Sequence, residues 1–115
     1  MSFDVQDNKL NREKGSKAVS RLYSVQALFQ MESGNLSVEQ VQSEFSIYRD
    51  QENIEFSNFG RADLSLFKQI LDGAIKNQNL IDQLITSLLK DGWEFSRIDP
   101  TLRSIFRAAS SELLL

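Results

Sequence analysis

The 115-residue sequence contains no cysteine and no histidine, only one proline and only five glycines. The absence of Cys and His excludes disulfides, thiolate nucleophiles, imidazole bases and nearly every kind of zinc site. The scarcity of proline and glycine argues against a sandwich or barrel, because those folds need frequent tight turns. No apolar run reaches the roughly 18 residues that span a bilayer, and the polar N-terminus lacks the pattern of a secretion signal. We therefore expect a helical, cytoplasmic protein that does not contact a membrane.

Hydrophobic residues make up 41% of the chain and recur at the three- and four-residue spacing of amphipathic helices. This content is sufficient for one core, so we expect a single all-α domain over residues 1–115 with about five helices. Residues 1–15 lack this periodicity, and we expect them to form a flexible basic arm. We expect residues 50–60 to form a loop. The helices are expected to begin after residues able to cap an N-terminus: Ser16, Ser37, Asp63, Asn79 and Asp99.

Several local features of the sequence support the placement and packing of these helices. Ser37 and Gln40 have the spacing of a capping box, and Gly34 marks the end of the helix before it. Gly73 interrupts an apolar helix, which indicates that a neighbouring helix crosses too closely for a side chain. The following helix is expected to be deeply buried, because it is the most apolar stretch of the chain. Its six apolar residues are Leu80, Ile81, Leu84, Ile85, Leu88 and Leu89.

The last predicted helix begins at Pro100 and runs into three leucines at the end of the sequence without a polar or glycine stop. We expect it to present five residues to the core: Leu102, Ile105, Phe106, Ala109 and Leu113. Because the sequence ends without a stop signal, we expect the chain to be cut within or just after a helix. Apolar surface left uncovered there would favour dimers or aggregation.

Positive charge is concentrated near the N-terminus. Between residues 9 and 21 there are five Lys or Arg and one Glu, a local charge of +4 in a chain whose net charge is −3. At helical spacing Lys14, Lys17 and Arg21 fall on one side of the first helix, beside its apolar stripe, and Arg12 lies just before them. Such a cationic ridge is suited to the backbone of RNA, although an ordinary solvated helix face has the same pattern. The sequence contains no phosphate-binding loop, nucleophile elbow or metal-ligand spacing, so we expect neither an enzyme nor a cofactor or metal.

Three stretches resemble the NusB family. Residues 17–30, with Arg21 and the run Gln-Ala-Leu-Phe ending at Phe29, resemble the first helix of that family. Residues 67–74, which include Gly73, are similar to its central helix, and residues 98–113 are similar to a later one. The three stretches occur in the order and spacing of the family over nearly the whole chain. Relatives continue for two further helices, which the resemblance implies are missing here.

The resemblance implies an all-helical NusB-like fold and a role in transcription antitermination at ribosomal RNA operons. It implies that the protein binds the single-stranded boxA element of the nascent transcript together with the ribosomal protein NusE, within the transcription elongation complex. It assigns RNA contact to Lys14, Lys17 and Arg21, with Arg12 as an outlying member of the set. It assigns NusE contact to Phe29, Thr101 and Leu102. Two other readings are open: the N-terminal helical module of a ribosomal-RNA cytosine methyltransferase, and a purely structural adaptor that binds protein partners.

Overall fold

The computed structural model describes residues 2–46 and 62–115, and their side chains from Gly15 onward. The described part is all-α and contains no strand. Its α-helices are α1 (Ser2–Gly34), α2 (Val38–Glu44), α4 (Leu64–Lys76), α5 (Gln78–Leu88) and α6 (Pro100–Leu113), with a short 3-10 helix, η3 (Phe95–Arg97), before α6. The expected all-α class and the five helices are therefore confirmed in the described residues. The predicted loop at 50–60 lies outside them.

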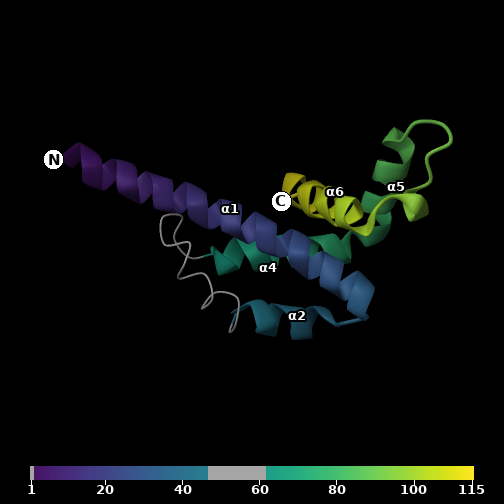
Figure 1. The fold of residues 1–115 in the computed structure, drawn as a ribbon, viewed down its shortest axis with the longest axis horizontal. Helices are drawn as coiled ribbons and strands as arrows, with labels where there is room; N and C mark the ends of the chain where they lie inside the picture. The colour runs from purple at the N-terminus through teal and green to yellow at the C-terminus, as the bar shows by residue number, and fades with distance from the viewer. Residues whose placement is uncertain (1, 47–61) are drawn as a thin grey trace.

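Helix α1 forms the long axis of the molecule, and α2, α4 and α6 all pack against it (Figure 1). It ends at Gly34 as expected, and Asn35 adopts a positive φ of 53° that reverses the chain. Its beginning differs from our expectation, because the helix starts at Ser2 and not after Ser16. The proposal that residues 1–15 act as a flexible basic arm stays a prediction.

The starts of α2 and α4 follow the chemistry that the sequence predicted. Ser37 Oγ accepts from the Gln40 backbone N–H, and the Gln40 side chain accepts from the Ser37 N–H, so both halves of the capping box are present. Asp63 Oδ1 accepts from the Leu66 N–H at 3.0 Å and caps α4. These bonds satisfy backbone donors that the first turn of a helix leaves free.

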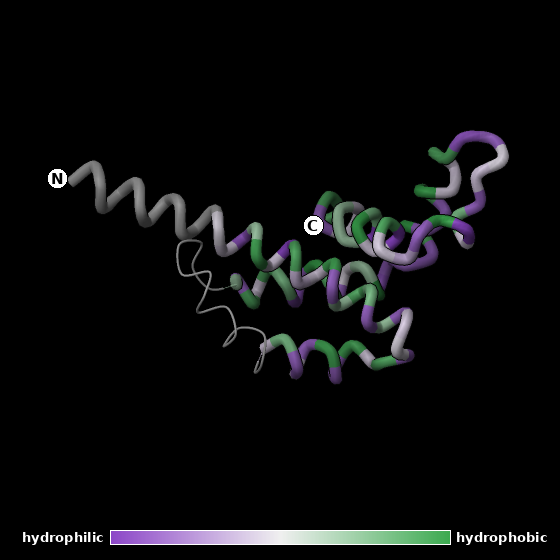
Figure 2. Tube along the Cα trace, viewed as in Figure 1, coloured by the Kyte–Doolittle hydropathy of each residue, from purple (hydrophilic) through white to green (hydrophobic). Residues whose placement is uncertain are grey.

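The core lies mainly between α1, α2 and α4, with a contribution from α6, and hydrophobic and hydrophilic positions alternate along each helix (Figure 2). At its centre Tyr23, Phe45 and Phe67 form a triangle of rings with centroids 5.2 to 6.3 Å apart. The edge-to-face contacts of Tyr23 with the other two rings add specificity to the burial of apolar area. The other buried members of the core are Ala27, Leu28, Val41, Ile70, Leu71, Ala74 and Ala108.

Helix α6 crosses α4 at Gly73, as the sequence predicted. A Cβ at that position would lie 2.7 Å from Ser111 Oγ, which itself donates to the Ile70 carbonyl at 2.6 Å. The buried residues of α6 are the small ones, namely Ser104, Ala108 and Ser111. Close packing between helices needs small side chains at the crossing, and this explains why they face inward.

This crossing corrects our expectation for the apolar residues of α6. Leu102, Ile105, Ala109 and Leu113 are exposed, and Phe106 is partly buried. The expected apolar surface near the end of the helix is therefore present, and a second copy that covers it stays a prediction.

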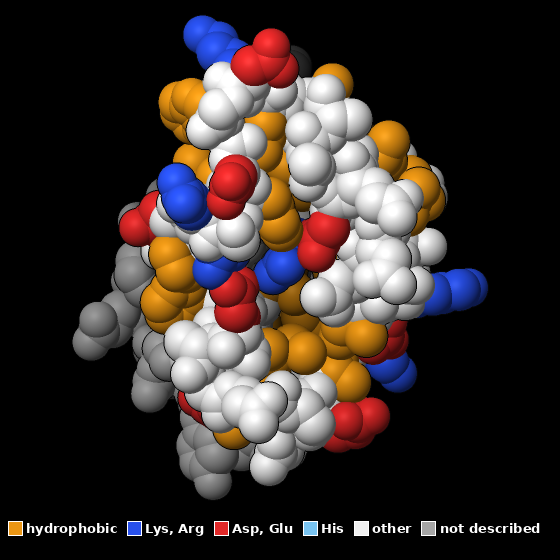
Figure 3. Space-filling model, turned by 90° about the vertical axis from the view of Figure 1, so that its right-hand side faces the viewer, with side chains coloured by type: hydrophobic (Ala, Val, Ile, Leu, Met, Phe, Trp, Pro, Cys, Tyr) orange, Lys and Arg blue, Asp and Glu red, His pale blue; other side chains and the backbone are white. Residues whose placement is uncertain are grey.

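The expectation that α5 is deeply buried is wrong: three of the six apolar residues on which it rested are exposed. Ile81 and Ile85 are buried, whereas Leu80, Leu84 and Leu88 form an exposed stripe, with Leu88 84% exposed. Helix α5 is apolar on two sides, and the described residues cover only one of them. Hydrophobic side chains consequently appear between charged groups on the face shown in Figure 3.

Candidate nucleic-acid interface

Two of the predicted RNA-contact residues have described side chains, and both lie on α1 beside the C-terminal end of α6. Lys17 and Arg21 are one helical turn apart, and both are exposed. Ser20, between them in sequence, is buried and donates from its Oγ to the carbonyl oxygens of Ser16 and Asp63, both at 2.8 Å. This second bond fixes α1 against the start of α4 and so fixes the orientation of the helix that carries Lys17 and Arg21.

Arg21 is paired with Glu112 of α6. Its Nε donates to both carboxylate oxygens at 2.9 Å, and its Nη2 donates to Oε1 at 2.7 Å. The hydrogen bond and the charge of Glu112 raise the pKa of Arg21, and Arg21 in turn lowers the pKa of Glu112, with a further contribution from Lys17. The Arg21 side chain nevertheless remains 52% exposed. The guanidinium is therefore both held in place and open to solvent.

Lys17 lies just beyond this pair. It forms no ion pair with the residues whose side chains are described. Together Lys17, Arg21 and Glu112 carry one net positive charge at the surface. The backbone of Arg12 and Lys14 belongs to α1, and their side chains lie outside the described residues.

The residues expected to contact a protein partner are exposed on two helices. Phe29 of α1 and Leu102 of α6 are each 37% exposed, and Thr101 is exposed in the first turn of α6. That turn is fixed by Asp99, whose Oδ1 accepts from the Thr101 backbone N–H at 2.8 Å. An open groove of about 340 Å³ adjoins this turn, and Leu102 and the exposed Trp93 are among its lining residues.

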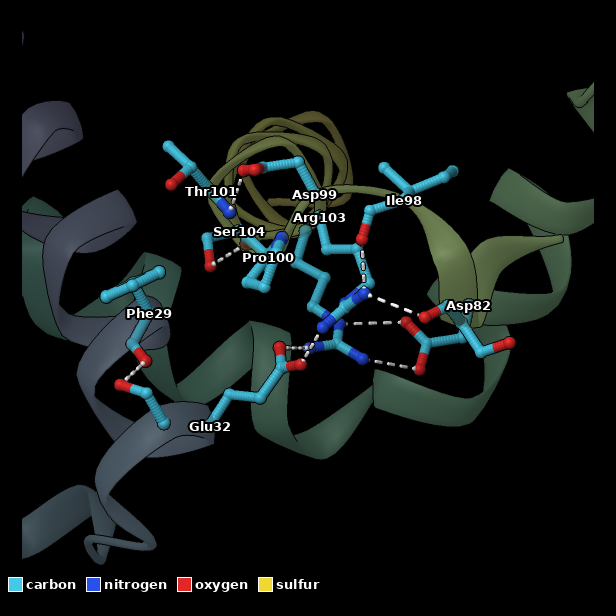
Figure 4. Close-up of polar contacts among 12 residues, drawn as sticks. Phe29, Glu32, Asp82, Ile98, Asp99, Pro100, Thr101, Arg103 and Ser104 are labelled. Atoms are coloured by element: carbon cyan, nitrogen blue, oxygen red, sulfur yellow. Dashed lines mark hydrogen bonds and ion pairs between the residues drawn. The ribbon is translucent and has the colours of Figure 1, made fainter. Parts of the chain in front are cut away.

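An ionic cluster that sequence reasoning missed joins α1, α5 and α6 (Figure 4). Glu32 accepts from Arg103 and Arg107, and Arg107 also donates to both oxygens of Asp82 at 3.0 and 3.1 Å. The hydrogen bond from Arg103, followed by the charges of both arginines, lowers the pKa of Glu32.

Further contacts hold the two arginines of the cluster in place. Arg103 also donates to the carbonyls of Ser96 and Ile98, and the Arg107 guanidinium lies 5.2 Å from the centroid of the Phe95 ring. The four-residue spacing of the two arginines places them on one face of a helix. Their acidic partners could not be identified from sequence, because those lie on two other helices.

The described residues show neither a metal-binding cluster nor a membrane-spanning helix. They contain no group of three or more acidic, Cys or His side chains that could hold a metal ion. None of their helices is both long and apolar enough to cross a membrane. The described surface contains a cationic strip formed by Lys17 and Arg21, exposed apolar side chains, and the ionic cluster of Glu32, Asp82, Arg103 and Arg107.

Comparison with known proteins gives a consistent result. The profile of the NusB family matches residues 18–115. The chain is 38% identical over 103 residues to the transcription antitermination protein NusB of Sinorhizobium fredii, covering 90% of this chain and 64% of that protein. It is 36% identical over 110 residues to the NusB of Rhizobium rhizogenes, covering 95% of this chain and 69% of the relative. For the NusB of Allorhizobium ampelinum the identity is 39% over 98 residues, covering 85% and 61%. The chain thus spans about two thirds or less of the length of these relatives, and no solved structure gave a significant match.

Proposed function

The chain belongs to the NusB family, and we propose that it is a non-enzymatic transcription antitermination factor that binds single-stranded RNA through helix α1. We propose that its RNA ligand is the boxA element of nascent ribosomal RNA transcripts and that it acts with NusE in the elongation complex. The relatives are named for antitermination, and the RNA and protein ligands follow from the family resemblance of residues 17–30 and 98–113.

The observation that carries this proposal is the exposure of Lys17 and Arg21 on one side of α1 in a chain with a net charge of −3. Positive side chains in a row attract phosphates and release their condensed counterions, which gives affinity that depends on salt. Arg21 presents a planar fork that matches the oxygens of a phosphate, and Lys17 adds a mobile point charge. Arg12 and Lys14, earlier in α1, extend the proposed RNA contact toward the N-terminus.

The proposed NusE contact uses Phe29, Thr101 and Leu102. Half-exposed aromatic and aliphatic side chains beside a fixed helix start are typical of the apolar centre of a protein interface. Phe29 lies beyond Lys17 toward the C-terminal end of α1, and Leu102 lies in the first turn of α6, at the opposite end of that helix from Glu112. The two ligands would therefore contact different residues and could bind at the same time.

The test is the exchange of Lys17 for Glu, measured by fluorescence anisotropy with a labelled boxA oligonucleotide. We expect roughly tenfold weaker binding at low salt and a logarithmic salt slope that is smaller by about 0.7, the loss expected for one phosphate contact of a single strand. Lys90→Glu is the matched control, because Lys90 is also exposed but lies after α5, away from α1. Equal RNA affinity in the Lys17→Glu and Lys90→Glu variants would defeat the proposal. Retained NusE binding without RNA affinity would support a protein-binding adaptor instead.

A further inference from the structure

We infer that Glu112 occupies the position on Arg21 that an RNA phosphate takes, so that Glu112 sets the RNA affinity of this surface by competing with the ligand. This inference rests on the proposed RNA-binding function and deepens it. It concerns the last turn of α6, to which the RNA assignment from sequence gave no role.

In this pair the Glu112 carboxylate already occupies the oxyanion-binding side of Arg21. Three hydrogen bonds of 2.7 to 2.9 Å join the Nε and Nη2 groups of Arg21 to the Glu112 carboxylate. Arginine binds carboxylates and phosphates with the same fork of parallel donors. A phosphate that binds the Nε and Nη2 side of the Arg21 fork therefore meets donors that Glu112 already uses.

The position of the pair makes such an exchange possible. The side chains of Arg21 and Glu112 are 52% and 28% exposed, so a ligand can reach both from solvent. Ion pairs at this exposure are weak because water and salt screen them. Glu112 also lies next to Leu113, the last residue of α6, where the helix dipole is negative and disfavours a carboxylate. A phosphate would release Glu112 to solvent without leaving a buried charge behind.

Lys17 connects this pair to the rest of the cationic strip. Its charge contributes to the lowered pKa of Glu112, which places the carboxylate within the field of both cations. Glu112 thus cancels one of the two positive charges on the described part of the strip. Its removal would double the charge that an RNA strand meets there.

The decisive variant is Glu112→Gln, which keeps the shape of the side chain and removes its charge. We expect RNA affinity to rise about fivefold at low salt and the salt slope to steepen by about 0.7, because one more phosphate contact forms. Glu39→Gln is the matched control, since it removes an exposed carboxylate from α2 and should change affinity less than twofold. The double variant Arg21→Gln/Glu112→Gln should return to near wild-type affinity, because Arg21 carries the gain.

Three results would overturn the inference. Weaker RNA binding by Glu112→Gln would mean that Glu112 positions Arg21 for RNA and does not compete. A gain that persists in the double variant, or equals that of Glu39→Gln, would mean that only the overall charge matters. Helicity and thermal unfolding are measured for each protein, and Glu112→Asp, which shortens the carboxylate but keeps its charge, replaces Glu112→Gln if that variant does not fold. The Asp variant should gain affinity in the same direction and by less.

The Lys17→Glu variant separates this inference from the function on which it rests. If Lys17→Glu weakens RNA binding but Glu112→Gln does not strengthen it, the RNA-binding function stands and the competition is refuted. If neither wild type nor Glu112→Gln binds RNA in a salt-dependent way, both proposals are refuted.

Discussion

The half of the molecule built from α1, α2 and α4 is held together differently from the half that contains α5 and α6. In the first half, aromatic and aliphatic side chains such as Phe45, Phe67 and Ile70 are almost completely buried. In the second half, leucines are exposed, and the residues of α6 that face inward are Ser104, Ala108 and Ser111. Ion pairs from Arg103 and Arg107 then attach α6 to α1 and α5.

This difference separates stability from binding. A closely packed apolar core supplies most of the free energy of folding and leaves little surface for ligands. The α6 side keeps its charged and apolar groups near the surface, where a partner or an RNA strand can reach them. Mutations of buried residues in the core should therefore lower stability, whereas mutations of exposed groups, including Lys17 and Arg21 where α1 borders α6, should affect binding. The following variants test that division.

The largest effect is expected in the core. Phe67→Ala removes a ring that is 1% exposed and contacts the rings of Tyr23 and Phe45. We expect a loss of about 3 to 5 kcal/mol in the free energy of unfolding, measured by urea denaturation. Leu88→Ala is the control from the other half, because Leu88 is 84% exposed and should cost less than about 0.5 kcal/mol. Equal losses in the two variants would contradict the division between the halves.

A smaller effect is expected where the halves meet. Gly73→Ala places a Cβ 2.7 Å from Ser111 Oγ and forces that hydroxyl away from the Ile70 carbonyl. Overpacking and the lost buried bond outweigh the better helix propensity of alanine, so we expect a net loss of about 1 to 2 kcal/mol.

The control for this contact is the double variant Gly73→Ala/Ser111→Ala. It removes the clashing oxygen, and the Ile70 carbonyl lies within α4, where the helix supplies a backbone donor. We expect its urea midpoint to return close to that of the wild type. A midpoint as low as that of Gly73→Ala alone would show that the clash is not with Ser111.

Much of this fold could be predicted from the sequence, because its signals are local. The capping box at Ser37, the cap at Asp63 and the proline at the start of α6 all act within one helical turn, and the structure has each of them. Gly73 predicted a helix crossing because a glycine inside a helix is a local sign that a neighbouring helix leaves no room for a side chain. The direction of the apolar side chains on α5 and α6 was not predictable, because both helices carry apolar residues on two sides and only tertiary packing selects the buried side.

The candidate site was predictable only in part. The spacing of Lys17 and Arg21 placed them together on α1, and both are exposed. The partner of Arg21 lies 91 residues away on α6, so its pairing with Glu112 could not be inferred from spacing. The same holds for Glu32, whose two arginines are brought to it by the antiparallel contact of α1 with α6.

The smallest effect is expected at Glu32, and it depends on pH. Hydrogen bonding to Arg103, together with the charges of Arg103 and Arg107, holds the pKa of Glu32 below the 4.5 of an unperturbed glutamate. The unfolded chain therefore binds more protons than the folded chain between these two pKa values, and stability rises with pH across that window. The contribution is complete above about pH 4.5 and is lost as the pH falls through the lower, folded pKa.

Glu32→Gln should remove this contribution, which we expect to be about 1 kcal/mol at pH 7 because the side chain is 31% exposed and partly screened. Urea midpoints of wild type and variant should differ at pH 7 and converge as the pH falls through the lowered, folded pKa of Glu32. Glu94→Gln is the control, since Glu94 pairs only with the largely exposed Arg97 among the described residues and should follow the wild type throughout. A difference that stays constant with pH would mean that Glu32 acts through packing, and the attachment of α6 to α1 would then be steric and not ionic.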